Sequence, residues 1–127
     1  MPIVFGHSVV DPQTIATAIR IGNPASWDLA VNAASVSGGE IRAVIDREIL
    51  ACYRRLAREG VFCEMASAAS VAGLLRISAD GTLPRGSTVV CVLTGHGLKD
   101  PQWAMQLTGR PPTVKADPEA VAAELGL

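Results

Sequence analysis

The sequence is poor in charged and aromatic side chains. Asp, Glu, Lys and Arg make up 18% of its 127 residues and aromatic residues 4%, whereas charged residues are about 25% of a typical soluble domain. The net charge is −1 and no run of like charges occurs, so the basic patch of a nucleic-acid-binding protein is lacking. Hydrophobic residues reach 49%. This leaves two interpretations open: an ordinary alanine-rich composition, or a surface partly meant for burial against another domain or chain.

Other absences exclude further classes of protein. No apolar run approaches the roughly 18–20 residues of a membrane span, and the first twelve residues lack the charged and apolar regions of a secretory signal. Cys52, Cys63 and Cys91 lie in apolar patterns without a C-x-x-C pair, which favours reduced thiols over disulfides or zinc ligands. Neither G-x-S-x-G nor G-x-x-x-x-G-K occurs, which disfavours a serine hydrolase and a Walker phosphate loop. We expect a cytoplasmic protein with no membrane and no nucleic-acid partner.

What the sequence does contain is an alternation of short apolar segments and longer amphipathic ones. The clearest helix begins at Asp46 and ends at Gly60, and its apolar residues repeat at helical spacing as one stripe of Ile49, Cys52, Tyr53, Leu56 and Ala57. Capping residues and periodicity predict further helices from Asn23-Pro24 to Gly38, from Ala66, from Pro101, and from Asp117-Pro118 to Gly126. Apolar strands are expected at 3–10, 41–45, 61–63 and 88–93, and 15–21 fits either a strand or a helix.

This order of elements predicts an α/β fold. Helices between short, continuously apolar strands are typical of a doubly wound, mostly parallel sheet with helices on both faces. The length suits one domain covering residues 1–127. Its last part is expected to be a proline-rich loop at 109–117 and a terminal helix at 118–126.

Polar residues and glycines follow two of the expected strands, namely Glu64, Ser67, Thr94, Gly95, His96 and Gly97. Ligands of open α/β sheets bind beyond the carboxyl ends of the strands, and in a parallel sheet these ends share one edge. Gly95 and Gly97 can adopt positive φ and let the backbone approach a ligand closely. Thr94 offers a neutral hydroxyl that donates or accepts a hydrogen bond. The combination would suit a flat heterocycle with a ring nitrogen.

Each of these residues also has a plainer interpretation. Gly95 and Gly97 could simply shape a turn. Glu64 is a candidate catalytic acid, but it could instead cap the next helix or pair with an arginine. His96 is a candidate general base or metal ligand, yet the other histidine, His7, is far away in sequence, which disfavours a metal site.

Three segments give the sequence a family likeness. They are TAIRIGNPASW at 17–27, EGVFCEMASAASVAGLL at 59–75 and CVLTGHGLKD at 91–100. In this order and at this spacing they resemble the C-terminal part of threonine synthase, and the likeness runs from about Phe5 to the last expected helix. The resemblance implies the tryptophan-synthase-β-like fold of the fold type II pyridoxal-phosphate enzymes. It also implies a reaction that converts O-phosphohomoserine and water into threonine and phosphate.

The resemblance assigns a role to the last motif. Thr94 matches the threonine of T-G-x-G-L-K-D that faces the pyridine nitrogen of pyridoxal phosphate in the family. A hydroxyl at that place does not force the nitrogen to carry a proton, and so it moderates the cofactor as an electron sink. Gly95 and Gly97 are weaker cofactor-binding candidates. Met65 stands where the family usually has proline after the glutamate, which could loosen the turn after Glu64.

The family's Schiff-base lysine and its Gly/Asn loop for the cofactor phosphate lie in an N-terminal portion that precedes these motifs. The chain has two lysines. Lys99 belongs to the C-terminal motif and is expected to form a surface pair with Asp100, and Lys115 lies in the proline-rich loop. We therefore expect no catalytic residue, no covalent attachment of pyridoxal phosphate and no metal in this chain.

The resemblance implies a partner, the lysine-bearing N-terminal portion, supplied in cis or in trans, and we also expect a homo-oligomer. Three interpretations of function remain open. The chain could be a piece or one half of a split threonine synthase that contributes one wall of the cofactor site. It could be a remnant that associates with itself or a partner and catalyses nothing. It could belong to a related pyridoxal-phosphate lyase such as a threonine dehydratase, which the T-G-x-G-L-K-D motif disfavours.

Overall fold

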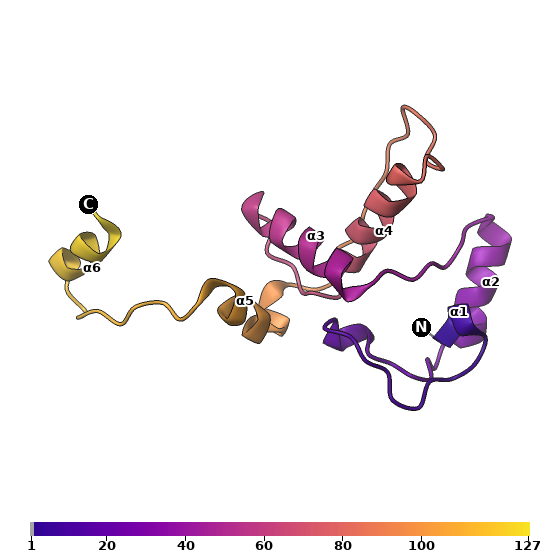
Figure 1. Cartoon of the computed structure of the whole chain (residues 1–127), viewed down its shortest axis with the longest axis horizontal. Helices are drawn as coiled ribbons and strands as arrows, with labels where there is room; N and C mark the ends of the chain where they lie inside the picture. Colours follow the sequence, from indigo (N-terminus) through magenta and orange to yellow (C-terminus); the bar gives the residue numbers. More distant parts are fainter. Residues whose placement is uncertain (1) are drawn as a thin grey trace.

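The computed structural model describes residues 2–127 as helices joined by turns and long extended segments (Figure 1). The helices are α1 (Pro2–Phe5), α2 (Trp27–Ser37), α3 (Asp46–Arg58), α4 (Ala68–Ala79), α5 (Pro101–Thr108) and α6 (Pro118–Leu125). Two short 3-10 turns are η1 (Thr17–Ile19) and η2 (Gly97–Lys99). Among these described helices, none has both the length and the apolar character to cross a membrane.

The predicted doubly wound parallel sheet does not form within residues 2–127. The one pairing of extended backbone there is an isolated antiparallel bridge between Cys63 and His96. Segments 41–45 and 88–93, expected as strands, are not assigned to any strand. An apolar pattern indicates that a segment suits a pleated, buried environment, but a strand also needs hydrogen bonds from a neighbouring strand. In the described residues these segments have no such neighbour.

Helix α3 follows the prediction closely. Its first turn is held by the Glu48 carboxylate, which accepts a hydrogen bond from the Ile45 N–H at 3.0 Å. Gly60, at φ +81°, takes the left-handed conformation that ends the helix. Ile49, Cys52 and Tyr53 are its buried residues, and all three belong to the predicted apolar stripe.

The N-terminal predictions are partly wrong. The expected strand at 3–10 begins instead with the short helix α1. The ambiguous segment 15–21 contains one 3-10 turn. Helix α2 begins at Trp27 and not at Asn23-Pro24, although Gly38 ends it as predicted, at φ +65°. Asparagine and proline favour a helix start but do not require one, and here they come just before the turn that leads into α2.

A small core lies where α3 and α4 pack against each other, near the centre of Figure 1. Its buried side chains are Ala16, Ile49, Cys52, Tyr53, Cys63, Met65, Ala68 and Ala72. Met65 is only 1% exposed and is one of the two largest fully buried side chains. The residue that departs from the family's proline is therefore a core residue of this chain.

The rest of the chain is open. It exposes 9234 Å², whereas a folded monomer of 13.2 kDa exposes about 6,400 Å². Helices α2 and α6 bury no residue, and α6 lies away from the core beyond the extended segment 109–117 (Figure 1). Many large apolar side chains are therefore in contact with solvent.

Candidate functional site

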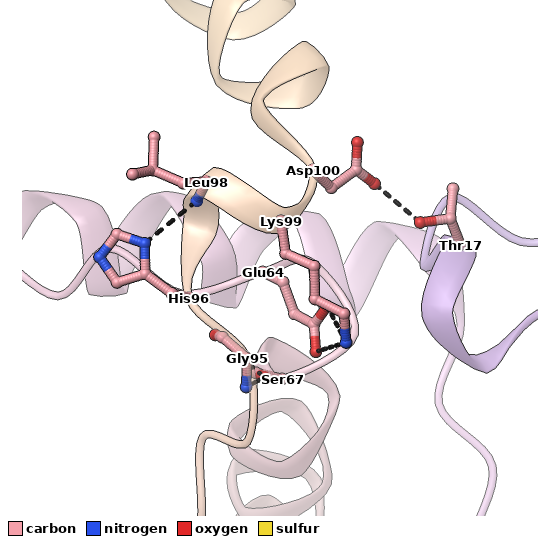
Figure 2. A network of polar contacts seen from close by, with 8 residues as sticks. All are labelled: Thr17, Glu64, Ser67, Gly95, His96, Leu98, Lys99 and Asp100. Carbon is pink, nitrogen blue, oxygen red and sulfur yellow. Dashed lines mark hydrogen bonds and ion pairs between the residues drawn. The ribbon is translucent and has the colours of Figure 1, made fainter.

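The two polar loops singled out in the sequence lie against each other. They meet as antiparallel segments, not as the ends of parallel strands. The Glu64 N–H donates to the Gly95 carbonyl at 2.9 Å, and the Gly97 N–H donates to the Phe62 carbonyl at 3.1 Å. Figure 2 shows the junction that results, which we define as residues 62–67 and 95–100.

The side chain of Ser67 joins the two loops of this junction by hydrogen bonds. Its side-chain oxygen accepts a hydrogen bond from the Gly95 N–H at 2.9 Å, and its own proton is directed to the Gly95 carbonyl over a longer 3.5 Å. The Ser67 N–H donates to the Glu64 carbonyl at 3.1 Å. Since Ser67 is 4% exposed, these contacts are shielded from water.

Glu64 carries a buried carboxylate that is paired with Lys99. The residue is 5% exposed, and the Lys99 Nζ lies 3.2 Å from Oε2 and 3.4 Å from Oε1. The expected arginine partner of Glu64 is therefore wrong, because the cation beside the carboxylate is Lys99. A buried carboxylate needs such a partner because its desolvation is otherwise unfavourable.

The predicted surface pair of Lys99 and Asp100 is wrong. Asp100 accepts a hydrogen bond from the Thr17 Oγ1 at 2.8 Å, on the side of the junction away from Glu64 (Figure 2). Lys99 is the last residue of η2 and Asp100 follows it. Neighbouring side chains of a 3-10 turn point about 120° apart, so the two charges face different parts of the chain.

Gly95 and Gly97 are packed tightly against other residues of the junction. Neither has a positive φ. A Cβ on Gly95 would overlap the Glu64 carboxylate, and a Cβ on Gly97 would overlap the Phe62 ring. The glycines therefore allow close packing within the protein, and the structure gives no sign that they shape a left-handed turn.

His96 lies on the exposed side of the junction. Its Nδ1 accepts a hydrogen bond from the Leu98 N–H at 3.2 Å, and its ring meets the edge of Phe62 with 5.4 Å between the ring centroids. His7 bonds instead to the neighbouring Ser8 carbonyl. Within residues 2–127, no cluster of three or more His, Cys, Asp or Glu residues is arranged to hold a metal ion.

Thr94 comes directly before the junction and is exposed. The hydrogen bonds between the two loops use Ser67, Gly95, the Glu64–Lys99 pair and backbone groups, and none of them uses the Thr94 hydroxyl. The hydroxyl is therefore available to a ligand. A neutral group that both donates and accepts fits the ring nitrogen of pyridoxal phosphate in either protonation state.

Two thiols near the site are buried and have raised pKa values. Burial raises the pKa of the Cys63 thiol beside the junction and that of the Cys52 thiol in α3. All three cysteines are free, in agreement with the prediction of reduced thiols. A raised pKa leaves little thiolate at neutral pH, so Cys63 is not a candidate nucleophile.

Residues 4–95 match the family described as "Pyridoxal-phosphate dependent enzyme". The chain belongs to this family. Pyridoxal phosphate is therefore its cofactor, as predicted, and membership implies the fold type II architecture of these enzymes, although residues 2–127 form no sheet. The match includes Glu64, Ser67 and Thr94 and ends at Gly95.

The chain is also similar to threonine synthases, as the resemblance predicted. It is 56% identical over 127 residues to that of Mycobacterium tuberculosis H37Rv, covering 99% of this chain and 35% of the relative. It is 57% identical over 118 residues to that of Halalkalibacterium halodurans, covering 92% of this chain and 33% of the relative. It is 47% identical over 108 residues to that of Methanocaldococcus jannaschii, covering 84% of this chain and 27% of the relative. The chain thus spans about a third of the length of these curated relatives.

The three segments that carry the likeness meet in space. Thr17 comes from 17–27, Glu64 and Ser67 from 59–75, and Gly95 to Asp100 from 91–100, and hydrogen bonds join all three. Sequence reasoning missed the Thr17–Asp100 and Glu64–Lys99 pairs. The one signal in the sequence was that the polar residues concerned all lie within these three segments.

Proposed function

We propose that this chain is the C-terminal segment of a threonine synthase-like catalytic domain and that it forms one wall of the cofactor site through Thr94. The observation that carries the proposal is the 56% identity to a threonine synthase over 99% of the chain. The reaction would be that implied by the resemblance, from O-phosphohomoserine and water to threonine and phosphate. The free, exposed Thr94 hydroxyl at the end of segment 88–93 supports this role.

The part of this chain in the chemistry is to hold and tune the cofactor. When bound, pyridoxal phosphate withdraws electrons from the substrate. The Thr94 hydroxyl would bind the pyridine nitrogen as a neutral partner. The Glu64–Lys99 and Thr17–Asp100 pairs hold the loop that carries Thr94.

The lysine that binds the cofactor must come from elsewhere. The ammonium of Lys99 is held by the Glu64 carboxylate, and Lys115 lies exposed in the extended segment 109–117. We propose that a lysine-bearing N-terminal portion completes the site, in cis or in trans. The many large apolar side chains that are exposed support such a partner, because exposed apolar surface favours burial.

A chimera tests this function. The chain would replace the matching C-terminal third of the Mycobacterium tuberculosis threonine synthase. We expect the chimera to show the visible absorption band of lysine-bound pyridoxal phosphate and to release phosphate from O-phosphohomoserine. The Thr94→Val variant should lower kcat/KM about tenfold or more, the effect of one lost hydrogen bond of roughly 1.5 kcal/mol, and Thr94→Ser should retain most activity.

Thr113→Val is the matched control, because Thr113 is exposed in the segment 109–117, and it should leave activity unchanged. A folded chimera that binds no pyridoxal phosphate would disprove the proposed function. Mixing this chain with the separate N-terminal portion then tests whether the two work in trans. Dehydration of threonine, without phosphate release from O-phosphohomoserine, would point to the threonine dehydratase interpretation.

The same exposed surface also supports the second candidate, a non-catalytic protein that associates with itself. Measuring self-association of the chain by sedimentation, with and without the lysine-bearing portion, distinguishes the two candidate functions. Tight self-association that the lysine-bearing portion does not compete with would favour the second candidate. A homo-oligomer and a cytoplasmic location both stay predictions.

A further inference from the structure

We propose that Ser67 is a positioning residue, which sets the direction of the Thr94 hydroxyl by holding the amide of Gly95. This inference rests on the proposed function, since it concerns how Thr94 is presented to pyridoxal phosphate. It goes further because it names the group on which the placement of Thr94 depends.

The contact acts directly on the backbone of Thr94. The N–H of Gly95 belongs to the same planar peptide unit as the carbonyl of Thr94. When Ser67 Oγ accepts from that N–H at 2.9 Å, it fixes the rotation of this plane and with it the ψ angle of Thr94. The other side of Gly95 is fixed as well, because its carbonyl accepts from the Glu64 N–H at 2.9 Å.

The hydroxyl of Ser67 is not used for its own helix. Ser67 occupies the N-cap position of α4 but makes no side-chain capping hydrogen bond. By contrast, Ser70 in the same helix bonds back to the Ser67 carbonyl at 2.9 Å, as serines in helices commonly do. The Ser67 side chain instead reaches a loop 28 residues away in sequence, so its contribution is to the loop that follows Thr94.

Packing leaves the loop little freedom to take another arrangement. Gly95 lies so close to the Glu64 carboxylate that a Cβ would overlap it. That carboxylate is held in turn by Lys99 at 3.2 Å. If the Ser67 hydroxyl is removed, the Gly95 N–H loses its partner, and the peptide unit before it loses the one side-chain hydrogen bond that fixes its rotation.

Hydrogen exchange in the full chain gives a readout that needs no cofactor. In Ser67→Ala, the Gly95 amide should exchange about tenfold faster or more, because an open amide is no longer protected by a hydrogen bond. Ser70→Ala is the matched control, with the same change three residues further along, and should leave the Gly95 rate unchanged. An unchanged Gly95 rate in Ser67→Ala would overturn the proposal.

A double-mutant cycle in the chimera tests whether Ser67 acts through Thr94. Ser67→Ala alone should weaken the affinity for pyridoxal phosphate roughly three- to tenfold, the range of one neutral hydrogen bond, measured by fluorescence titration. In the Thr94→Val background the same change should weaken it less than about twofold, because coupled residues are not additive. A purely structural role would weaken it by the same factor in both backgrounds and would contradict the inference.

Two precautions keep the outcomes distinct. If Ser67→Ala fails to fold, Ser67→Thr and Ser67→Val replace it, because threonine and valine have the same shape and only threonine has the hydroxyl. Binding of pyridoxal phosphate that Ser67→Thr retains and Ser67→Val loses supports the proposal. Equal binding by the two variants overturns it. Should the unmutated chimera fail to bind pyridoxal phosphate, the proposed function fails and this inference fails with it. If the chimera binds the cofactor equally well with and without the Ser67 hydroxyl, this inference is wrong and the proposed function stands.

Discussion

Two neighbouring regions of the chain differ in how far their polar groups are hydrogen-bonded and their apolar side chains are buried. They are the junction at residues 62–67 and 95–100 and the extended segment at 88–93. In the junction, backbone groups are paired, and the carboxylate of Glu64 meets Lys99. In the extended segment, Val90 is 82% and Val92 67% exposed. No backbone hydrogen bond of residues 88–93 occurs within the described part of the chain.

The difference shows which part of the structure this chain determines by itself. The junction needs only residues of the three likeness segments, and all of them are present. The extended segment offers unpaired backbone and apolar side chains on both faces, which suits pairing with further strands. The chain spans about a third of the length of its relatives, so the remaining two thirds are the source we expect for those strands.

The largest expected effect is on the free energy of unfolding, and it comes from Met65 in the buried junction. Met65→Ala should lower the free energy of unfolding by about 2–5 kcal/mol, because it empties a site in a close-packed core. Val90→Ala, on the exposed segment, should change it by less than about 0.5 kcal/mol. Urea denaturation of the isolated chain followed by circular dichroism measures both, and similar values would show that the core placed around Met65 is wrong.

A second comparison sets two glycines against each other. Gly95→Ala should destabilise the chain by about 1–3 kcal/mol, the usual cost of overpacking, because the added Cβ overlaps the Glu64 carboxylate. Gly73→Ala should stabilise it by about 0.5–1 kcal/mol, because Gly73 lies inside α4 with open space beside it and alanine favours a helix. Thermal unfolding of both variants gives the signs, and a stable Gly95→Ala protein would contradict the close contact.

The helices were predictable where their causes are local. For α3, the apolar stripe, the acidic first turn and Gly60 all lie within the helix or next to it. The sheet was not predictable in the same way, because strand pairing depends on segments far apart or outside the chain. The pattern at 88–93 predicted a strand, but no strand is assigned there, because an apolar pattern cannot supply the neighbouring strand that it would pair with.

The candidate site shows the same limit. The sequence singled out Glu64, Ser67, Gly95 and Gly97 because they follow apolar segments, and the structure brings these residues together. It did not reveal that Lys99 pairs with Glu64, since 35 residues separate them and an adjacent aspartate was the nearer partner. Gly95 and Gly97 pack tightly against Glu64 and Phe62, which cannot be read from a single glycine, and their role in binding the cofactor stays a prediction.

The cysteines give the smallest expected effect and the sharpest probe of the extended segment. Cys91 lies on that segment and is half-buried, whereas Cys52 and Cys63 are buried. Burial raises the pKa of these two thiols, so less of each is thiolate at pH 8 than for an ordinary cysteine. Iodoacetamide should therefore modify Cys91 several-fold faster than either, as measured by mass spectrometry of the peptides.

The partner proposed here should remove that difference in reactivity. If strands of the N-terminal portion pair with residues 88–93, Cys91 becomes covered, and its labelling should slow in the chimera while Cys52 and Cys63 stay slow. Cys91 that reacts equally fast in the isolated chain and in an active chimera would mean that the segment remains uncovered. The excess surface of this chain would then have to be buried elsewhere, and the exposed faces of α2 and α6 would be the next places to probe.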